Sequence, residues 1–219
     1  LIGQGPTATV FKLADSSAGF GNPATRKPMF TTQGGNYSFR INFWDLGLDT
    51  GSGNSGATGI DYIANNVGAI SDVAIRSGDG QGVAGVDMTR AWPGPCLVKN
   101  LHVHGFDVGI DIAHGEYGPT FENLVLSGQR VAGLRLGGNV ITVHNLVSSN
   151  TVPAVLVTGG SSHLILLGAT CLGGSSANAA VQLGAGHCYV RGLSCAGYVA
   201  AIGGSANVSG PTVAEYHTG

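Results

Sequence analysis

Residues 100–124 (NLHVHGFDVGIDIAHGEYGPTFENL) concentrate the side chains of this sequence that could do acid–base chemistry. The segment holds four carboxylates and three histidines, whereas all 219 residues contain only 12 carboxylates and 7 histidines. Two carboxyl groups facing one cleft can hydrolyse a glycosidic bond, and a ladder of carboxylate oxygens can instead bind Ca²⁺. Which of these chemistries is available depends on the elements that position the side chains.

Two series of short segments with alternating apolar residues recur along the sequence, the first at intervals of 22 to 28 residues. The first series opens with Asp, Asn or, in two degenerate copies, Gly: Asp45-LGL, Asp72-VAI, Asn100-LHV, Asn123-LVL, Asn145-LVS, Gly168-ATC and Gly192-LSC. The second series keeps step between them: GIDYI from Gly59, GVDMT from Gly85, GIDIA from Gly109, GLRLG from Gly133, AVLVT from Ala154 and AVQLG from Ala180. Each segment is short and alternates with period two, which predicts a strand with one buried face.

A repeat of this length is typical of stacked coils, which bury their hydrophobic faces only against one another. We predict an all-β fold: a single right-handed parallel β-helix (solenoid) of about 7–8 coils over residues 1–219, with 197–219 as a C-terminal cap or frayed end. The expected inward columns are Leu46, Val73, Leu101, Leu124, Leu146, Ala169 and Leu193, and Ile60, Val86, Ile110, Leu134, Val155 and Val181.

The Asp and Asn openers form a column of their own, which we interpret as structural rather than catalytic. Asn tolerates left-handed backbone geometry at a bend, and stacked amides can bond one another. Cys171 and Cys195 share an inward column one coil apart. We interpret them as core thiols, with a disulfide between them as the alternative.

Composition narrows the function classes. The net charge is −2 and no basic cluster appears, which argues against nucleic-acid binding through phosphate contacts. No apolar run is long enough to span a membrane, and four cysteines are too few for a disulfide scaffold. The sequence opens on LIGQG without an initiator Met or leader, and we interpret it as a fragment of a longer chain or as a processed chain.

Three strings resemble the pectate-lyase-like superfamily: NFWDLGLDTGSGNSGATGIDY, IRSGDGQGVAGVDMTR and PGPCLVKNLHVHGFDVGIDIAHGEYGPTFENL. The similarity covers roughly residues 1–175 and is closest to the rhamnogalacturonase/epimerase-like β-helix, the module that family 55 glycoside hydrolases also use. The GDG-x-TDDT-like opening and capping helix of that branch are absent, as if the sequence began inside the domain. The resemblance implies a secreted or cell-surface protein that acts on polysaccharide, and it carries no catalytic residue over to this sequence.

The outward column of the second series could supply acid–base groups. Residues on adjacent coils project about 5 Å apart, and this column reads Asp61, Asp87, Asp111, Arg135, Leu156 and Gln182. Repulsion among three stacked carboxylates is expected to raise at least one pKa, as a general acid beside an ionised partner requires. Alternatively, Ca²⁺ binds at Asp61, Asp87 and Asp111, or Arg135 neutralises the end of a purely structural ladder.

Two loops after the second-series strands could bind sugar. The segments TRAWPGPC (89–96) and AHGEYGPT (113–120) align Arg90 with His114, and Trp92 with Glu116 and Tyr117. An aromatic face can stack on a sugar ring while a nearby carboxyl protonates the glycosidic oxygen. In the alternative interpretation, Trp92 folds back against the coil and Glu116 is solvated.

The first series has an outward path of its own: Asp49, Arg76, His104, Ser127 and Ser149. This face is interpreted either as the edge of a sugar groove or as a surface packed under a partner domain. Two further alignments predict surface ion pairs, in which Lys99 meets Glu122 and Arg130 meets Asp107.

The leading hypothesis is a carbohydrate-active protein, a glycoside hydrolase, without a cofactor unless Ca²⁺ binds the aspartates. Its candidate catalytic residues are Glu116, Asp111 and Asp87, and its candidate substrate-binding residues are Trp92, Tyr117, His114, Arg90 and His104. The alternatives are a non-catalytic polysaccharide-binding or structural module (an adhesin or tail-spike segment), half of a two-helix enzyme, and a Ca²⁺-dependent polysaccharide lyase. The expected partners are a polysaccharide and, through open coil ends, a second β-helix domain or another copy.

Overall fold

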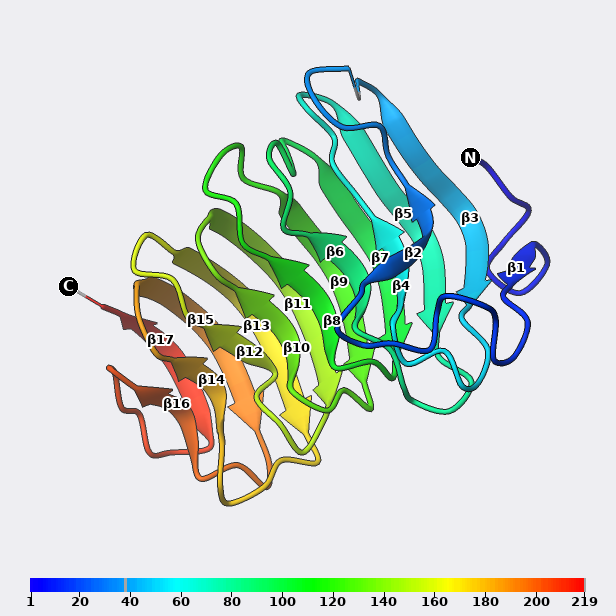
Figure 1. Cartoon of the computed structure of the whole chain (residues 1–219). Helices are drawn as coiled ribbons and strands as arrows, with labels where there is room; N and C mark the ends of the chain where they lie inside the picture. Colours follow the sequence, from blue (N-terminus) through cyan, green and yellow to red (C-terminus); the bar gives the residue numbers. More distant parts are fainter. Residues whose placement is uncertain (38, 219) are drawn as a thin grey trace.

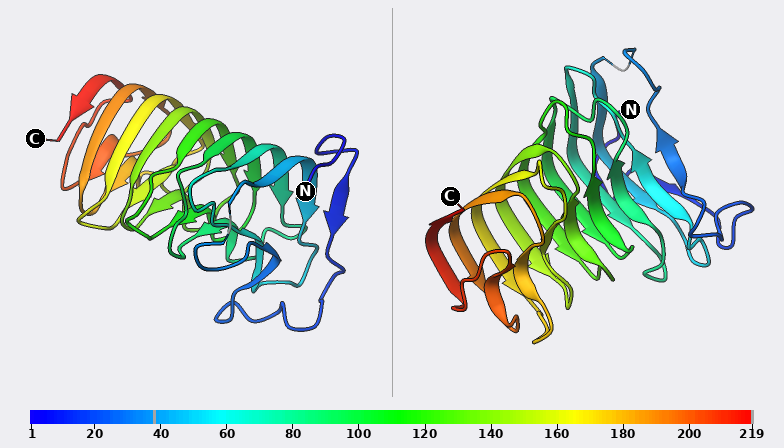
Figure 2. Two further views of the ribbon diagram at one scale, coloured as in Figure 1. Left: turned by 90° about the horizontal axis from the view of Figure 1, so that it is seen from above. Right: turned by 60° about the vertical axis from the view of Figure 1, so that its left-hand side comes forward.

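The structure is a computed structural model that describes residues 1–37 and 39–218. These residues form seventeen strands and no helix, and therefore no helix that could cross a membrane. The strands build two sheets that stack along one axis from the N-terminal to the C-terminal end (Figure 1). Figure 2 shows the same stack from two further directions, with one strand of each sheet contributed by each coil.

The two sheets alternate along the chain. The nine-stranded sheet contains β1 (Val10–Lys12), β3 (Ile41–Asp49), β5 (Gly68–Arg76), β7 (Leu97–His104), β9 (Thr120–Ser127), β11 (Val140–Ser149), β13 (His163–Leu172), β15 (His187–Cys195) and β17 (Thr212–His217). The eight-stranded sheet contains β2 (Lys27–Thr31), β4 (Ala57–Asp61), β6 (Ala84–Met88), β8 (Val108–Ile112), β10 (Ala132–Leu136), β12 (Val155–Val157), β14 (Ala179–Leu183) and β16 (Ala200–Gly204). Neighbours in each sheet are two elements apart in sequence, so each consecutive pair of strands makes one coil.

The observed pairing confirms the predicted parallel solenoid. All strand neighbours are parallel except β15 and β17, which are antiparallel. The register follows the repeat, since Leu46 lies opposite Val73, and Val73 opposite Leu101. Seven coils run from β3–β4 to β15–β16.

The core fills the inside of the coils. Both predicted inward columns are buried, and the most exposed member, Ala169, is only 5% accessible. A third buried column lies upstream of the openers and was missing from the sequence prediction. It consists of Phe43, Ile70, Val98, Phe121, Val143, Leu166 and Val190, paired in register on consecutive coils. The strands of the nine-stranded sheet are therefore about twice as long as the sequence pattern predicts.

The Asp and Asn openers explain this difference, because they lie in the middle of these strands. Their φ angles are positive at Asp45, Asp72, Asn100, Asn123 and Asn145 (51° to 60°), and Gly168 and Gly192 continue the column at 74° and 70°. A left-handed residue bends the strand and breaks its alternation. Inward residues therefore stand two before and one after each opener, as at Phe43 and Leu46 around Asp45.

Hydrogen bonds link four of the openers into an asparagine ladder, defined here as Asp72, Asn100, Asn123 and Asn145. Each amide Nδ2 donates to the previous Oδ1, over 2.8 Å from Asn100 to Asp72 and 3.0 Å at the next two steps. Hydrogen bonds from Ser71 and Asn100 lower the pKa of Asp72. The structural interpretation of the column is confirmed.

Extending the ladder by one step is expected to stabilise the protein. In a Gly168→Asn variant, the new Cβ would lie 3.1 Å from Asn145 Oδ1, which is a tight contact. The Asn145 side chain must therefore shift slightly before its Oδ1 can accept from the new amide. Asn tolerates the φ of 74° at this position. We expect the free energy of unfolding in urea to rise by about 0.5–1 kcal/mol. Gly168→Ala, which keeps the strained backbone and adds no amide, is expected to lower it, and equal destabilisation by both variants would contradict the ladder.

All four cysteines are free. Cys171 lies directly opposite Cys195 in the sheet, and burial raises the pKa of Cys171 to about 12. The core-thiol interpretation is therefore confirmed, and the alternative disulfide between these residues is wrong. A small apolar thiol packs in this column as an aliphatic side chain would.

The edge strands differ between the two ends of the stack. At the N-terminal end, the edge strands β1 and β2 are short and carry Lys12, Lys27 and Pro28, residue types that discourage pairing with another chain. At the C-terminal end, β17 covers the edge of β15, and Val208 pairs with Ile202 on β16. Association of another domain or copy through the coil ends stays a prediction.

Candidate functional site

Three aspartates form a column on the outer face of the eight-stranded sheet, as the repeat predicts. Asp61 on β4 lies opposite Asp87 on β6, and Asp87 lies opposite Asp111 on β8. Arg135 on β10 follows Asp111. We call Asp61, Asp87 and Asp111 the aspartate column. Its members are about 4.8 Å apart along the stack, the spacing between neighbouring strands.

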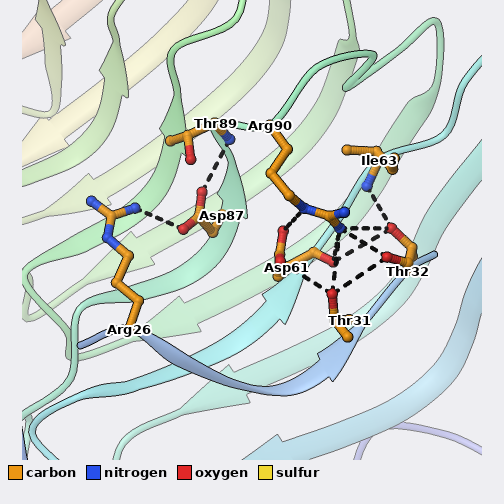
Figure 3. Close-up of polar contacts among 8 residues, drawn as sticks. All are labelled: Arg26, Thr31, Thr32, Asp61, Ile63, Asp87, Thr89 and Arg90. Carbon is orange, nitrogen blue, oxygen red and sulfur yellow. Dashed lines mark hydrogen bonds and ion pairs between the residues drawn. The ribbon is translucent and has the colours of Figure 1, made fainter. Parts of the chain in front are cut away.

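Each of these aspartates has an arginine partner. Arg135 binds Asp111 through two parallel bonds, Nε to Oδ1 at 2.8 Å and Nη2 to Oδ2 at 2.5 Å. Arg90 Nε lies 2.6 Å from Asp61 Oδ1. Figure 3 shows Arg90 turned toward Asp61 and the Thr31–Thr32 segment. The sequence alignment instead predicts Arg90 beside His114, whereas the structure pairs this loop arginine with Asp61 of the column.

Arg26, which the sequence reasoning missed, bridges two aspartates. Its Nη1 lies 2.7 Å from Asp87 Oδ2 and its Nη2 lies 3.1 Å from Asp111 Oδ2 (the Asp87 bond is drawn in Figure 3). Burial opposes the charge of Arg26, but its bonds and attraction to the two aspartates outweigh that effect and raise its pKa. The hydrogen bond to Asp111 likewise raises the pKa of Arg135.

These contacts correct the expectation of a bare carboxylate stack. Asp87 and Asp111 are buried, at 6% and 2% exposure, under arginines that are themselves partly accessible. Thr89 N also donates to Asp87 Oδ1 at 3.0 Å. Because every aspartate in the column is paired, repulsion between like charges does not dominate it. Arg135 neutralises the end of the column, as one of the alternatives predicts, while the further prediction of a purely structural ladder stays a prediction.

The oxygens of the aspartate column are paired with arginines and are not arranged to bind Ca²⁺. Over residues 1–37 and 39–218, no group of three or more His, Cys, Asp or Glu side chains is placed to hold a metal ion. The oxygens of Asp61, Asp87 and Asp111 are directed to guanidinium groups, whose positive charge takes the place that a hard cation would need. The donor set therefore suits arginine rather than Ca²⁺.

An open hollow of about 440 Å³ lies beside the aspartate column. We call it the ladder-side hollow, and its lining residues are Arg26, Thr89, Asp111, Ala113, Arg135, Gly137 and Thr158. Four of these residues, Thr89, Ala113, Gly137 and Thr158, come directly after the ends of β6, β8, β10 and β12. The hollow is thus built by four successive coils and by the arginines that cover the column.

The two candidate loops continue from the rim of this hollow, and each carries an aromatic residue with left-handed backbone. Trp92 has a φ of 64° and is half-buried, whereas Tyr117 has a φ of 59° and is 50% exposed. Bulky residues rarely adopt this conformation, and such strain is concentrated at functional sites. The loops stack closely, because a Cβ on Gly94 would lie only 2.2 Å from Tyr117 O.

The remaining candidates lie as follows. Glu116 is exposed on the same loop as Tyr117, and its backbone N lies 3.4 Å from His114 Nδ1. Asn139 anchors this loop by donating to His114 O over 2.5 Å. His104 bonds Ser127 on β9 at 3.0 Å, on the outer face of the nine-stranded sheet. His104 is therefore on the other sheet from the hollow, while His114, Glu116 and Tyr117 follow its lining residue Ala113 in the chain.

Two predicted surface ion pairs are also present. Lys99 Nζ lies 3.2 Å from Glu122 Oε1, and Arg130 Nη2 lies 2.7 Å from Asp107 Oδ1. Glu122 is thus paired with Lys99 on the neighbouring coil. Within residues 100–124, the remaining candidate site residues near the eight-stranded sheet are Asp111, His114 and Glu116.

Comparison with protein families, with curated proteins and with solved structures finds no match to this chain.

Proposed function

We propose that this chain is a carbohydrate-active β-solenoid, secreted or exposed at a cell surface, that binds a polysaccharide along the outer face of its eight-stranded sheet. The observation that carries the proposal is the ladder-side hollow, which is lined by guanidinium groups and threonines. Two of its lining residues, Thr89 and Ala113, begin the loops that carry the half-buried Trp92 and the exposed Tyr117. Sugars are bound in this way, with hydroxyls held by a few fixed polar groups and ring faces stacked on aromatics. The resemblance to the pectate-lyase-like superfamily supports it.

The two aromatic loops continue along the chain from residues that line the hollow. Thr89 lines the hollow, and the chain then reaches Trp92; Ala113 lines it one coil later, and the chain then reaches Glu116 and Tyr117. A sugar unit seated against Arg135 would therefore have the aromatic loops as its next contact. Binding across several coils suits a polymer better than a small molecule, because structurally equivalent positions recur on each coil at the spacing between strands.

The variant Tyr117→Gly tests this proposal by separating binding from folding. We expect affinity for polysaccharide, measured by retardation in gels that contain the polymer, to fall at least about tenfold as the stacking surface is lost. The free energy of unfolding is expected to change by less than about 1 kcal/mol, since glycine relieves the left-handed strain while adding chain entropy.

Trp44→Ala provides the control for the Tyr117 experiment. Trp44 is another accessible aromatic residue, 37% exposed, but it lies on the nine-stranded sheet. Its removal is expected to leave the retardation unchanged. Retardation that is equal in wild type and Tyr117→Gly, or that is lost only in Trp44→Ala, would reject the eight-stranded sheet as the binding face.

Hydrolysis of the bound polymer is a second candidate function, favoured by the position of Glu116. This carboxylate is exposed on the loop that leaves the hollow, where it could reach a glycosidic oxygen. Asp111 and Asp87 suit this role less well, because their oxygens already accept bonds from Arg26, and those of Asp111 also from Arg135. Among the three proposed catalytic residues, Glu116 is thus the one whose carboxylate is open to a substrate.

A further inference from the structure

The charges that border the ladder-side hollow compensate one another. Arg26, Arg135 and Asp111 line the hollow, and Asp87 pairs with Arg26 from outside the lining. Two negative and two positive charges are thus joined by contacts of 2.5 to 3.1 Å. The next pair along the column, Arg90 with Asp61, is also balanced. The hollow therefore presents hydrogen-bonding groups without a net charge.

We infer that the ligand of this face is a neutral polysaccharide, recognised through its hydroxyl groups, and that polymers of uronic acids are rejected. The inference rests on the proposed function and specifies its substrate class. The hollow holds a carboxylate, Asp111, that is only 2% exposed, and a uronate carboxylate would have to approach it. An anion is tolerated in such a place only beside a cation that is not already neutralised.

Neither of the usual anchors for a uronate carboxylate is present. Arg135 uses its Nε and Nη2 on Asp111, and Arg26 uses both of its Nη atoms on Asp87 and Asp111. The described residues offer no cluster that could hold a bridging metal ion. A guanidinium group has five N–H donors, so the bond to Asp111 engages only two of those on Arg135. The others suit a neutral hydroxyl, which brings no charge that must be balanced.

The same balance predicts how selectivity can be reversed. Asp87→Asn removes one negative charge. Thr89 N and Arg26 bond different oxygens of Asp87, so the single amide oxygen can keep the bond from Thr89 N while Arg26 loses its acceptor on this residue. The hollow would then carry a net positive charge near Arg26, which attracts an anion. We expect the ratio of uronate to neutral-polymer affinity to rise at least about tenfold at low ionic strength and to fall back in high salt.

The experiment compares wild type and variants by gel retardation with a neutral β-glucan, a xylan, polygalacturonate and alginate, each with and without Ca²⁺. Wild type is expected to bind at least one neutral polymer and neither uronate. Asp107→Asn is the matched control, because Asp107 pairs with Arg130, which does not line the hollow, whereas Asp87 pairs with Arg26, which does. It is expected to leave the selectivity unchanged. Urea unfolding checks that each variant is folded.

The outcomes separate the inference from the proposed function. Wild type that prefers a uronate polymer, in either condition, would overturn the inference and leave polysaccharide binding intact. An Asp87→Asn variant that is folded and shows the wild-type selectivity, or a gain of equal size in Asp107→Asn, would also overturn it. Wild type that binds none of the four polymers would contradict the proposed function itself.

Discussion

Replacing Asn123 with alanine is expected to lower the free energy of unfolding by about 2–5 kcal/mol, measured in urea. Asn123 has a φ of 56° and occupies the centre of the asparagine ladder. It donates to Asn100 and accepts from Asn145, each over 3.0 Å. Alanine forfeits both bonds, at about 0.5–1.5 kcal/mol each, and also strains the left-handed backbone by roughly 1–2 kcal/mol.

Asn123→Gly separates these two contributions. Glycine removes the same hydrogen bonds but adopts positive φ without strain. We expect it to cost about 1 kcal/mol less than alanine, which isolates the backbone contribution. If alanine and glycine both changed the unfolding free energy by less than about 0.5 kcal/mol, the ladder would not be what holds the bend in each coil.

If the chain also hydrolyses the bound polymer, Glu116→Gln is expected to have the largest effect on the rate of hydrolysis. The loss of a general acid lowers a reaction rate by about 10²–10⁴-fold, and release of reducing ends from the neutral polymer measures it. The effect should appear in kcat rather than KM, because the amide keeps the size of the side chain and loses only its proton. Asp111→Asn belongs in the same assay, since Asp111 lines the hollow.

Glu215→Gln is the matched control for the hydrolysis assay. Glu215 is also exposed, but it lies on β17 of the nine-stranded sheet, where it accepts from Tyr189 over 3.0 Å. It should leave the rate unaffected. Wild type that releases no reducing ends, or Glu116→Gln and Asp111→Asn variants with the wild-type rate, would remove hydrolysis at this site and leave a binding module.

The repeat in the sequence was sufficient to predict the coils and their vertical register. Asp87 and Asp111 are 24 residues apart, and they pair because each coil contributes one strand to each sheet. The alternating pattern after Asp45 and its equivalents predicts only the downstream half of each long strand. Their positive φ reverses the alternation at that point, so period-two logic cannot cross it.

Arg26 could not be predicted from the columns, because it lies outside the residues that repeat recognisably. Extending the second series upstream would have aligned the strand KPMFT with β4, where Phe30 pairs with Ile60. That alignment still leaves the reach of Arg26 undetermined, since its contacts with Asp87 and Asp111 span several coils. The sequence therefore predicts which carboxylates are neighbours, but not that an arginine directly before β2 neutralises Asp87 and Asp111.

Binding of polysaccharide to the outer face of the eight-stranded sheet is tested by amide hydrogen exchange of the whole protein, measured with and without a neutral polysaccharide that it binds. We expect slower exchange in the loops at 89–96 and 113–120 and at the ends of β6, β8 and β10, with the nine-stranded sheet unchanged. The other prominent hollow, lined by His163, His187 and Tyr189 on that sheet, serves as the internal comparison. Protection at β13 and β15, with none in the two loops, would contradict binding at the arginine–aspartate face.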